Sequence, residues 1–81
     1  MILEVSRGHV RVQVGGRVVT VQGEMFFPKN EKMGFVLYRD SIRTWDKPNE
    51  LDALTADEVN SLIAEIQDEF SRGGHTLEIE T

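Results

Sequence analysis

The chain contains no cysteine. This absence excludes disulfide bridges, thiolate metal ligands and cysteine nucleophiles, and nothing else in the sequence suggests a secreted protein. No apolar run approaches the roughly 18 residues of a membrane span, and the N-terminus lacks the apolar core of a signal peptide. We therefore expect a soluble, cytoplasmic protein without a membrane partner.

Aromatic residues are also scarce, with four Phe, one Tyr and one Trp in 81 residues. A chain of this length has room for one core, so we expect residues 1–81 to form a single domain. Folding such a small core needs nearly every apolar side chain, which leaves little for a deep substrate cleft. The single tryptophan, Trp45, stands in the polar segment SIRTWDKP, where closing the edge of a core is its most common role.

Positive charge is scarce in the second half of the chain. Residues 1–45 hold seven Lys/Arg against four Asp/Glu, whereas residues 46–81 hold two against ten, and the net charge is −5. An uneven distribution of this kind keeps a protein soluble and also steers an oppositely charged partner.

Alternating valines in the first third of the chain predict a β-hairpin. Val10, Val12 and Val14 alternate with polar residues, Gly15-Gly16 follows, and the alternation resumes in residues 17–22. Two glycines suit a two-residue turn that needs positive φ. This turn pairs Val12 with Val19 and Val10 with Val21, so that four valines form a ladder on one face of the sheet. The other face carries His9, Arg11, Gln13, Val18, Thr20 and Gln22.

Residues 24–27 are expected to continue the second hairpin strand beyond a bulge or bend at Gly23, and a polar loop follows over residues 28–34. Further strands are expected at residues 2–5, 35–38, 42–45 and 77–80. Thr55 and Glu58 form a capping-box pattern that predicts the start of a helix over residues 56–72. Gly73-Gly74 predicts its end. One apolar stripe recurs at helical spacing and consists of Val59, Leu62, Ile63, Ile66 and Phe70. The expected fold is α+β: a largely antiparallel sheet of five to six strands with one amphipathic helix packed on one face, in the order β-β-β-β(-β)-α-β.

Catalytic and metal-binding patterns are missing. His9 and His75, the only histidines, follow turns and lack the spacing of a metal site. None of the serines stands in a nucleophile elbow or a recognisable triad, and no helix follows Gly15-Gly16 to make a phosphate loop. We predict a protein that is not an enzyme and has no metal and no cofactor.

Away from its apolar stripe, the predicted helix carries five carboxylates, which are Asp57, Glu58, Glu65, Asp68 and Glu69. No Lys or Arg lies among them to form i,i+4 pairs. The first two are favoured by the helix dipole, but Asp68 and Glu69 lie near the C-terminal end. Such charge in a small domain indicates either that it keeps the protein soluble or that it serves to bind a basic partner.

The order of features resembles a known family. A valine-rich hairpin, QGE at 22–24, FVLYRDSIRTWDKP at 35–48, a capped helix ending in glycine and a short acidic strand are similar to small immunity proteins of bacterial polymorphic toxin and contact-dependent inhibition systems. The nearest resemblance is to immunity protein 74, and it rests on Gly23-Glu24, Ile42, Trp45 and Pro48.

This resemblance implies a non-catalytic bacterial protein that binds and neutralises one cognate toxin domain in the cytoplasm. The toxin is expected to be basic, as nucleases often are. From the charge pattern we select the candidate partner-binding residues Trp45, Asp46, Asp57, Glu58, Glu65, Asp68 and Glu69.

Two other functions stay open at this point. One is a nucleic-acid-binding or regulatory module that uses the basic strand residues Arg7, Arg11 and Arg17 with Lys29 and Lys32 of the polar loop. The acidic balance of the chain and the absence of an aromatic ladder weigh against nucleic acid. The other is a structural domain that forms a homodimer through an exposed sheet edge.

Overall fold

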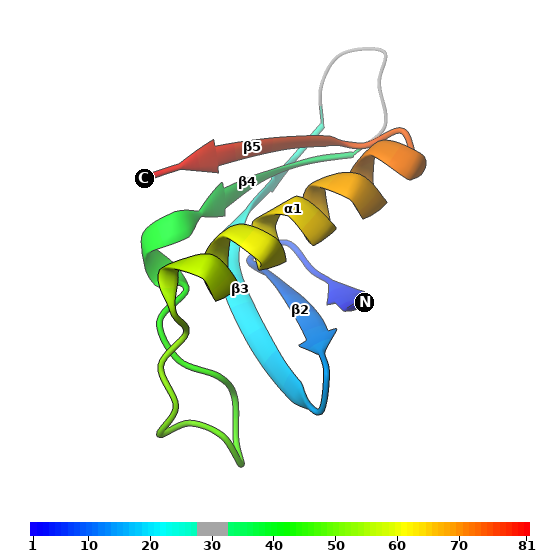
Figure 1. The fold of residues 1–81 in the computed structure, drawn as a ribbon. Coiled ribbons are helices and arrows are strands. Elements are labelled where there is room, and N and C mark those ends of the chain that lie inside the picture. Colours follow the sequence, from blue (N-terminus) through cyan, green and yellow to red (C-terminus); the bar gives the residue numbers. More distant parts are fainter. Residues whose placement is uncertain (28–32) are drawn as a thin grey trace.

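The computed structural model describes residues 1–27 and 33–81, so most of the expected polar loop, with Lys29 and Lys32, lies outside the described residues. The chain forms a five-stranded sheet in the order β1-β2-β3-β4-β5, with a helix between β4 and β5 (Figure 1). The elements are β1 (Ile2–Val5), β2 (His9–Val14), β3 (Arg17–Phe26), β4 (Gly34–Tyr38), the 3-10 turn η1 (Arg39–Ser41), α1 (Ala56–Arg72) and β5 (Thr76–Glu80).

The sheet is mixed. The pairings β1–β2, β2–β3 and β3–β4 are antiparallel, whereas β4 and β5 run parallel. A parallel pair requires a crossover connection, and here α1 provides it. The expected α+β class, with a largely antiparallel sheet and one helix on one face, is confirmed.

The β2–β3 hairpin has the register that the valine pattern predicts. Val10 pairs with Val21, Val12 with Val19, and Val14 with Arg17. Gly15 has a φ of 61° and Gly16 has no positive φ, as a type II′ turn requires. The four valines of the ladder are completely buried, so this face of the hairpin forms the centre of the core.

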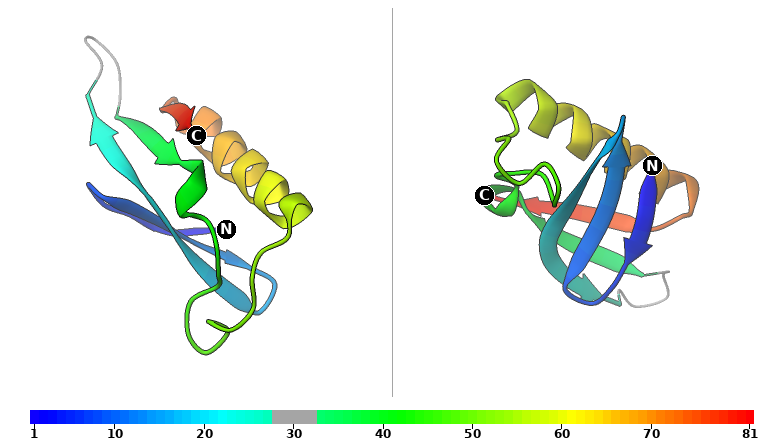
Figure 2. Two further views of the ribbon diagram at one scale, coloured as in Figure 1. Left: turned by 90° about the vertical axis from the view of Figure 1, so that its left-hand side faces the viewer. Right: turned by 90° about the horizontal axis from the view of Figure 1, so that it is seen from below.

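Helix α1 lies on one side of the sheet (Figure 2), and the valine ladder belongs to the same core as the helix. Its apolar stripe is buried as expected, and Phe35 and Leu37 of β4 complete the contact from the sheet. The Phe70 ring meets the Phe35 ring edge to face at 6.4 Å, a geometry that aromatic pairs favour.

Both predicted helix ends are confirmed. The Glu58 amide donates to Thr55 Oγ1 at 3.1 Å, and the Thr55 amide donates to Glu58 Oε1 at 2.9 Å. These reciprocal bonds satisfy two backbone donors in the region where a helix leaves its amides unpaired. At the other end Gly74 adopts the left-handed conformation, with a φ of 77°.

Two local predictions were wrong. Residues 42–45 do not form a strand, because only Thr44 makes a ladder contact there, in an isolated bridge to Ala53. Gly23 does not interrupt β3, which continues from Arg17 to Phe26. Instead β3 changes its neighbour at Gly23: residues 17–22 pair with β2 and residues 23–26 pair with β4.

Close packing requires a glycine at residue 23, where β3 changes its neighbouring strand. A Cβ at Gly23 would come closer than 3.0 Å to the Val36 carbonyl oxygen and to the Phe35 ring. Gly8 is a matched comparison, because a Cβ there meets nothing within 4 Å.

We predict that Gly23→Ala lowers the free energy of unfolding by about 1–3 kcal/mol, because backbone and a core ring must move. Gly8→Ala is expected to change it by less than about 0.5 kcal/mol. Urea unfolding of the two variants measures the difference. Equal stability of the two variants would contradict the close packing at Gly23.

Candidate partner-binding site

Trp45 lies in the loop between η1 and α1, which folds back on itself. The Trp45 amide donates to the Asp52 carbonyl at 3.2 Å, and the Leu54 amide donates to the Arg43 carbonyl at 2.9 Å. The Trp45 side chain is 2 % exposed and belongs to the same core as the valine ladder. It therefore closes the edge of the core, as the sequence leads one to expect.

Residues 41–46 lie along the first half of β3, on the strand edge that does not pair with β2 or β4. The Asp46 amide donates to the Val18 carbonyl at 2.7 Å, and the Asp46 carboxylate accepts from the Thr20 amide and hydroxyl at 3.2 and 2.6 Å. The Gln22 amide donates to Ser41 Oγ at 3.1 Å. Asp46 therefore uses its carboxylate to hold this loop on the sheet.

Arg17 joins Trp45 to the start of the helix. Its guanidinium carbon lies 4.1 Å from the centroid of the Trp45 ring system, within cation–π distance. The same guanidinium donates to Glu58 Oε2 at 2.8 Å. Hydrogen bonding by the Thr55 backbone amide, with a further contribution from Arg17, lowers the pKa of Glu58 below its usual value.

A pocket of about 400 Å³ opens beside this cluster, between the end of the hairpin and the first half of α1. Val14, Trp45 and Leu62 provide its apolar wall. The helix adds four polar residues, which are Asp57, Glu58, Ser61 and Glu65. The pocket therefore combines apolar surface with three carboxylates, and no Lys or Arg lies among its lining residues.

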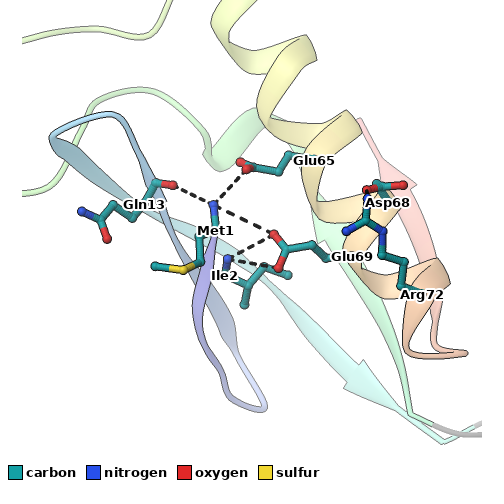
Figure 3. Close-up of polar contacts among 7 residues, drawn as sticks. All are labelled: Met1, Ile2, Gln13, Glu65, Asp68, Glu69 and Arg72. Carbon is teal, nitrogen blue, oxygen red and sulfur yellow. Dashed lines mark hydrogen bonds and ion pairs between the residues drawn. The ribbon is translucent and has the colours of Figure 1, made fainter.

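The next turns of the helix hold the N-terminus (Figure 3). The Met1 amine donates to Glu65 Oε1 at 2.9 Å and to the Gln13 carbonyl at 2.8 Å, and it lies 3.9 Å from Glu69 Oε2. The Ile2 amide also donates to Glu69, at 3.2 Å. Through these bonds, Glu65 and Glu69 connect the N-terminus and the start of β1 to α1.

The expectation that the helix carboxylates have no basic i,i+4 partner was wrong for Asp68, which pairs with Arg72 at 2.9 Å (Figure 3). Within residues 1–27 and 33–81, Asp57 is the helix carboxylate with no hydrogen bond or ion pair. Like the other first-turn acid, it interacts favourably with the helix dipole.

The candidate residues selected from the sequence therefore occupy different places. Trp45, Asp57, Glu58 and Glu65 line one pocket, whereas Asp46 is hydrogen-bonded to Thr20 of β3, and Asp68 and Glu69 lie further along the helix. Sequence reasoning missed the other lining residues, Val14, Ser61 and Leu62. Val14 carried a signal, because it is the one hairpin valine opposite a charged residue, Arg17.

The two histidines have structural partners. His9 Nδ1 lies 2.9 Å from Ser6 Oγ, and His9 Nε2 lies 2.8 Å from Glu4 Oε1, a Ser–His–Glu contact that the sequence did not predict. Ser6 Oγ also lies 3.3 Å from the His9 carbonyl, so the cluster fastens the β1–β2 turn. The His75 ring meets the Phe70 ring in an edge-to-face arrangement, with the two ring centroids 6.0 Å apart. The described residues contain no group of three potential metal ligands.

The arginines proposed for nucleic-acid binding do not share a face. Arg17 lies on the helix side of the sheet, where it pairs with Glu58, whereas Arg11 pairs with Thr20 on the opposite face. A continuous basic stripe through Arg11 and Arg17 is therefore not formed. No helix in the described part of the chain has the length and apolarity needed to cross a membrane.

The lowered pKa of Glu58 leads to a pH prediction. A carboxylate with a depressed pKa stabilises the fold above the pKa of the unfolded chain, and this contribution is lost as the pH falls through the folded-state value. We predict that wild type is more stable than Glu58→Gln at neutral pH and that the difference disappears on acidification below pH ~4. Thermal unfolding of both proteins across this range measures it. A difference that does not change with pH would show that the Glu58 charge contributes nothing.

Comparison with known protein families gives a match over nearly the whole chain. The family model described as immunity protein 74 matches residues 2–80, which is nearly the whole chain. No curated protein and no solved structure matches the chain. The matched region contains every strand, the helix, Trp45 and the pocket, and the family name denotes proteins that protect against a toxin. The chain belongs to the immunity protein 74 family.

Proposed function

We propose that this protein neutralises a cognate toxin domain by binding it, without catalysing a reaction, and that the first half of α1 with the adjoining pocket forms the contact. The family match supports the general role. The observation that supports the location is the pocket, because its apolar surface lies beside the unpaired carboxylate of Asp57. Binding sites typically combine an apolar surface with a few convergent polar groups.

The charge of this surface favours a basic partner. Three carboxylates line the pocket, and Asp68 and Glu69 continue the acidic character along the same helix. Complementary charge raises the rate of encounter and rejects wrong partners more than it raises affinity. A nuclease toxin with a basic substrate-binding surface, acting in the bacterial cytoplasm as part of a polymorphic toxin or contact-dependent inhibition system, has the chemistry that this surface would recognise.

Trp45 contributes in this proposal by shaping the site. Its side chain is almost completely buried, yet it lines the pocket and supports Arg17, which holds Glu58. A partner that enters the pocket would meet a wall whose position depends on the tryptophan. Trp45 therefore belongs to the core and to the contact surface together.

Charge steering predicts a difference between two double variants that each remove two negative charges. Asp57→Asn with Asp68→Asn changes the helix surface, and Glu78→Gln with Glu80→Gln changes β5. We expect the helix variant to slow association with the toxin domain by roughly tenfold at low salt, and the β5 variant to have a clearly smaller effect. Added salt should reduce the wild-type rate.

Stopped-flow association kinetics at several salt concentrations measure these rates. Thermal unfolding of each variant provides the control for folding. Equal association rates for the two double variants would show that the helix does not steer the partner.

The proposed role of Trp45 predicts an effect on dissociation. Trp45→Phe keeps an apolar ring but reduces the wall of the pocket and the surface beneath Arg17, so we expect faster dissociation with a nearly unchanged association rate. Phe70→Leu is the matched control, because Phe70 is equally buried but does not line the pocket. Surface plasmon resonance measures both rates. A Trp45→Phe protein that remains folded and dissociates at the wild-type rate would restrict the tryptophan to the core.

A further inference from the structure

We propose that the pocket receives one long basic side chain, a lysine or an arginine, from the protein partner. The identity of that partner as a toxin rests on the proposed function above, but the chemistry of the occupant follows from the pocket itself. Such a side chain has an aliphatic stem and a cationic head, and the pocket offers a surface for each.

The apolar wall fits the stem. Val14, at the end of β2, is 37 % exposed and supplies most of the accessible apolar surface, whereas Trp45 from the loop and Leu62 from the helix are each 2 % exposed and form the base of the wall. The volume of about 400 Å³ lies near the lower end of the range for ligand pockets, roughly 300–1,000 Å³. A space of this size suits one inserted side chain better than a whole helix or strand of the partner.

The polar residues on the helix fit the head. Asp57, Ser61 and Glu65 follow one another at intervals of four residues, so they form a row along the helix with steps of about 6 Å. A cation that moves along this row stays within reach of a carboxylate or a hydroxyl oxygen. An amine donates three hydrogen bonds and a guanidinium five, and this row presents acceptors for them.

The carboxylates are not equally satisfied within the chain. Glu58 is bonded to Arg17, and Glu65 is bonded to the Met1 amine. The side chains of Asp57 and Ser61 have no hydrogen bond or ion pair within the part of the chain that the structure describes. The free acceptors of the pocket therefore lie at Asp57 and Ser61, beside two acidic residues that already hold cations.

The chain itself shows how this region accommodates a guanidinium. Arg17 lies over Trp45 with its guanidinium carbon 4.1 Å from the ring centroid, and it pairs with Glu58 at 2.8 Å. An aromatic surface and a carboxylate thus hold one cation next to the pocket. A second cation from a partner would meet another carboxylate, that of Asp57, which lines the pocket beside Trp45.

Other occupants fit less well. An acidic peptide or a nucleic-acid phosphate would meet the unpaired carboxylate of Asp57 and be repelled, because no Lys or Arg lies among the lining residues. A neutral apolar side chain would fill the wall but cover Asp57 without giving it a partner, and a buried charge without a partner is unfavourable. The charge of the pocket therefore selects a cation.

Small probes test this chemistry without the toxin. The probes are the N-acetyl methylamides of arginine and lysine, with those of citrulline and norleucine as neutral controls of similar length. Two-dimensional NMR follows the amides of Ser61 and Leu62 and the indole N–H of Trp45, which gives one signal because the chain has a single tryptophan. We expect saturable shifts at these positions with the two cationic probes and weaker shifts with the neutral ones.

Two matched variants connect the shifts to the pocket. Asp57→Asn and Asp68→Asn make the same substitution on the same helix, but only Asp57 lines the pocket. We expect Asp57→Asn to weaken binding of the arginine and lysine probes by about two- to fivefold, the range for partly exposed ion pairs. Asp68→Asn should leave it nearly unchanged. Equal weakening by both variants, equal binding of neutral and cationic probes, or no shift with any probe would overturn the inference.

The same two variants separate this inference from the proposed function. If the toxin domain binds wild type, Asp57→Asn and Asp68→Asn with equal affinity, the pocket does not take a basic side chain although toxin binding stands. If the cationic probes bind as predicted and the toxin domain binds none of these proteins, the proposed function fails and the chemistry of the pocket stands.

Discussion

One helix has to cover the apolar face of a five-stranded sheet, and most features of this molecule follow from that constraint. Adjacent strands lie about 4.8 Å apart, so five strands span about 19 Å between the outer two, whereas a helix with its side chains is about 10–12 Å wide. Helix α1 buries the valine ladder and the inward side chains of β4. Two further contacts, outside the apolar stripe of the helix, complete the cover of the sheet.

At the start of β1 the N-terminus is fastened to α1 by Glu65 and Glu69, which draws β1 against the helix. Along the first half of β3, which does not pair with β4, the loop after η1 brings Trp45 into the core and covers the strand edge through Asp46. Val14 lies outside both of these contacts and stays partly exposed. The candidate site lies where this coverage ends, which explains why a chain with a small core still has an apolar pocket beside acidic residues.

Local patterns in the sequence sufficed for most of the fold. The alternation of valines fixed the hairpin register, and the capping box with the apolar stripe fixed the helix, because these signals act over a few residues. The loop at residues 42–45 was mistaken for a strand because its place beside the sheet depends on the bonds that the next residue, Asp46, makes to Val18 and Thr20, and these bonds join distant segments. The site was only partly predictable for the same reason: Asp57, Glu58 and Glu65 share a helix, but their meeting with Val14 and Trp45 depends on tertiary packing.

The central claim is that the partner binds at the first half of α1 and the adjoining pocket. Mapping NMR shift changes in this protein on titration with the cognate toxin domain tests it most directly, with the Val14 and Leu62 methyl groups and the amides of residues 57–65 as reporters. The account predicts the largest changes at these reporters and little change along the outer edge of β5. A footprint confined to β5 or to the sheet face opposite α1 would contradict it.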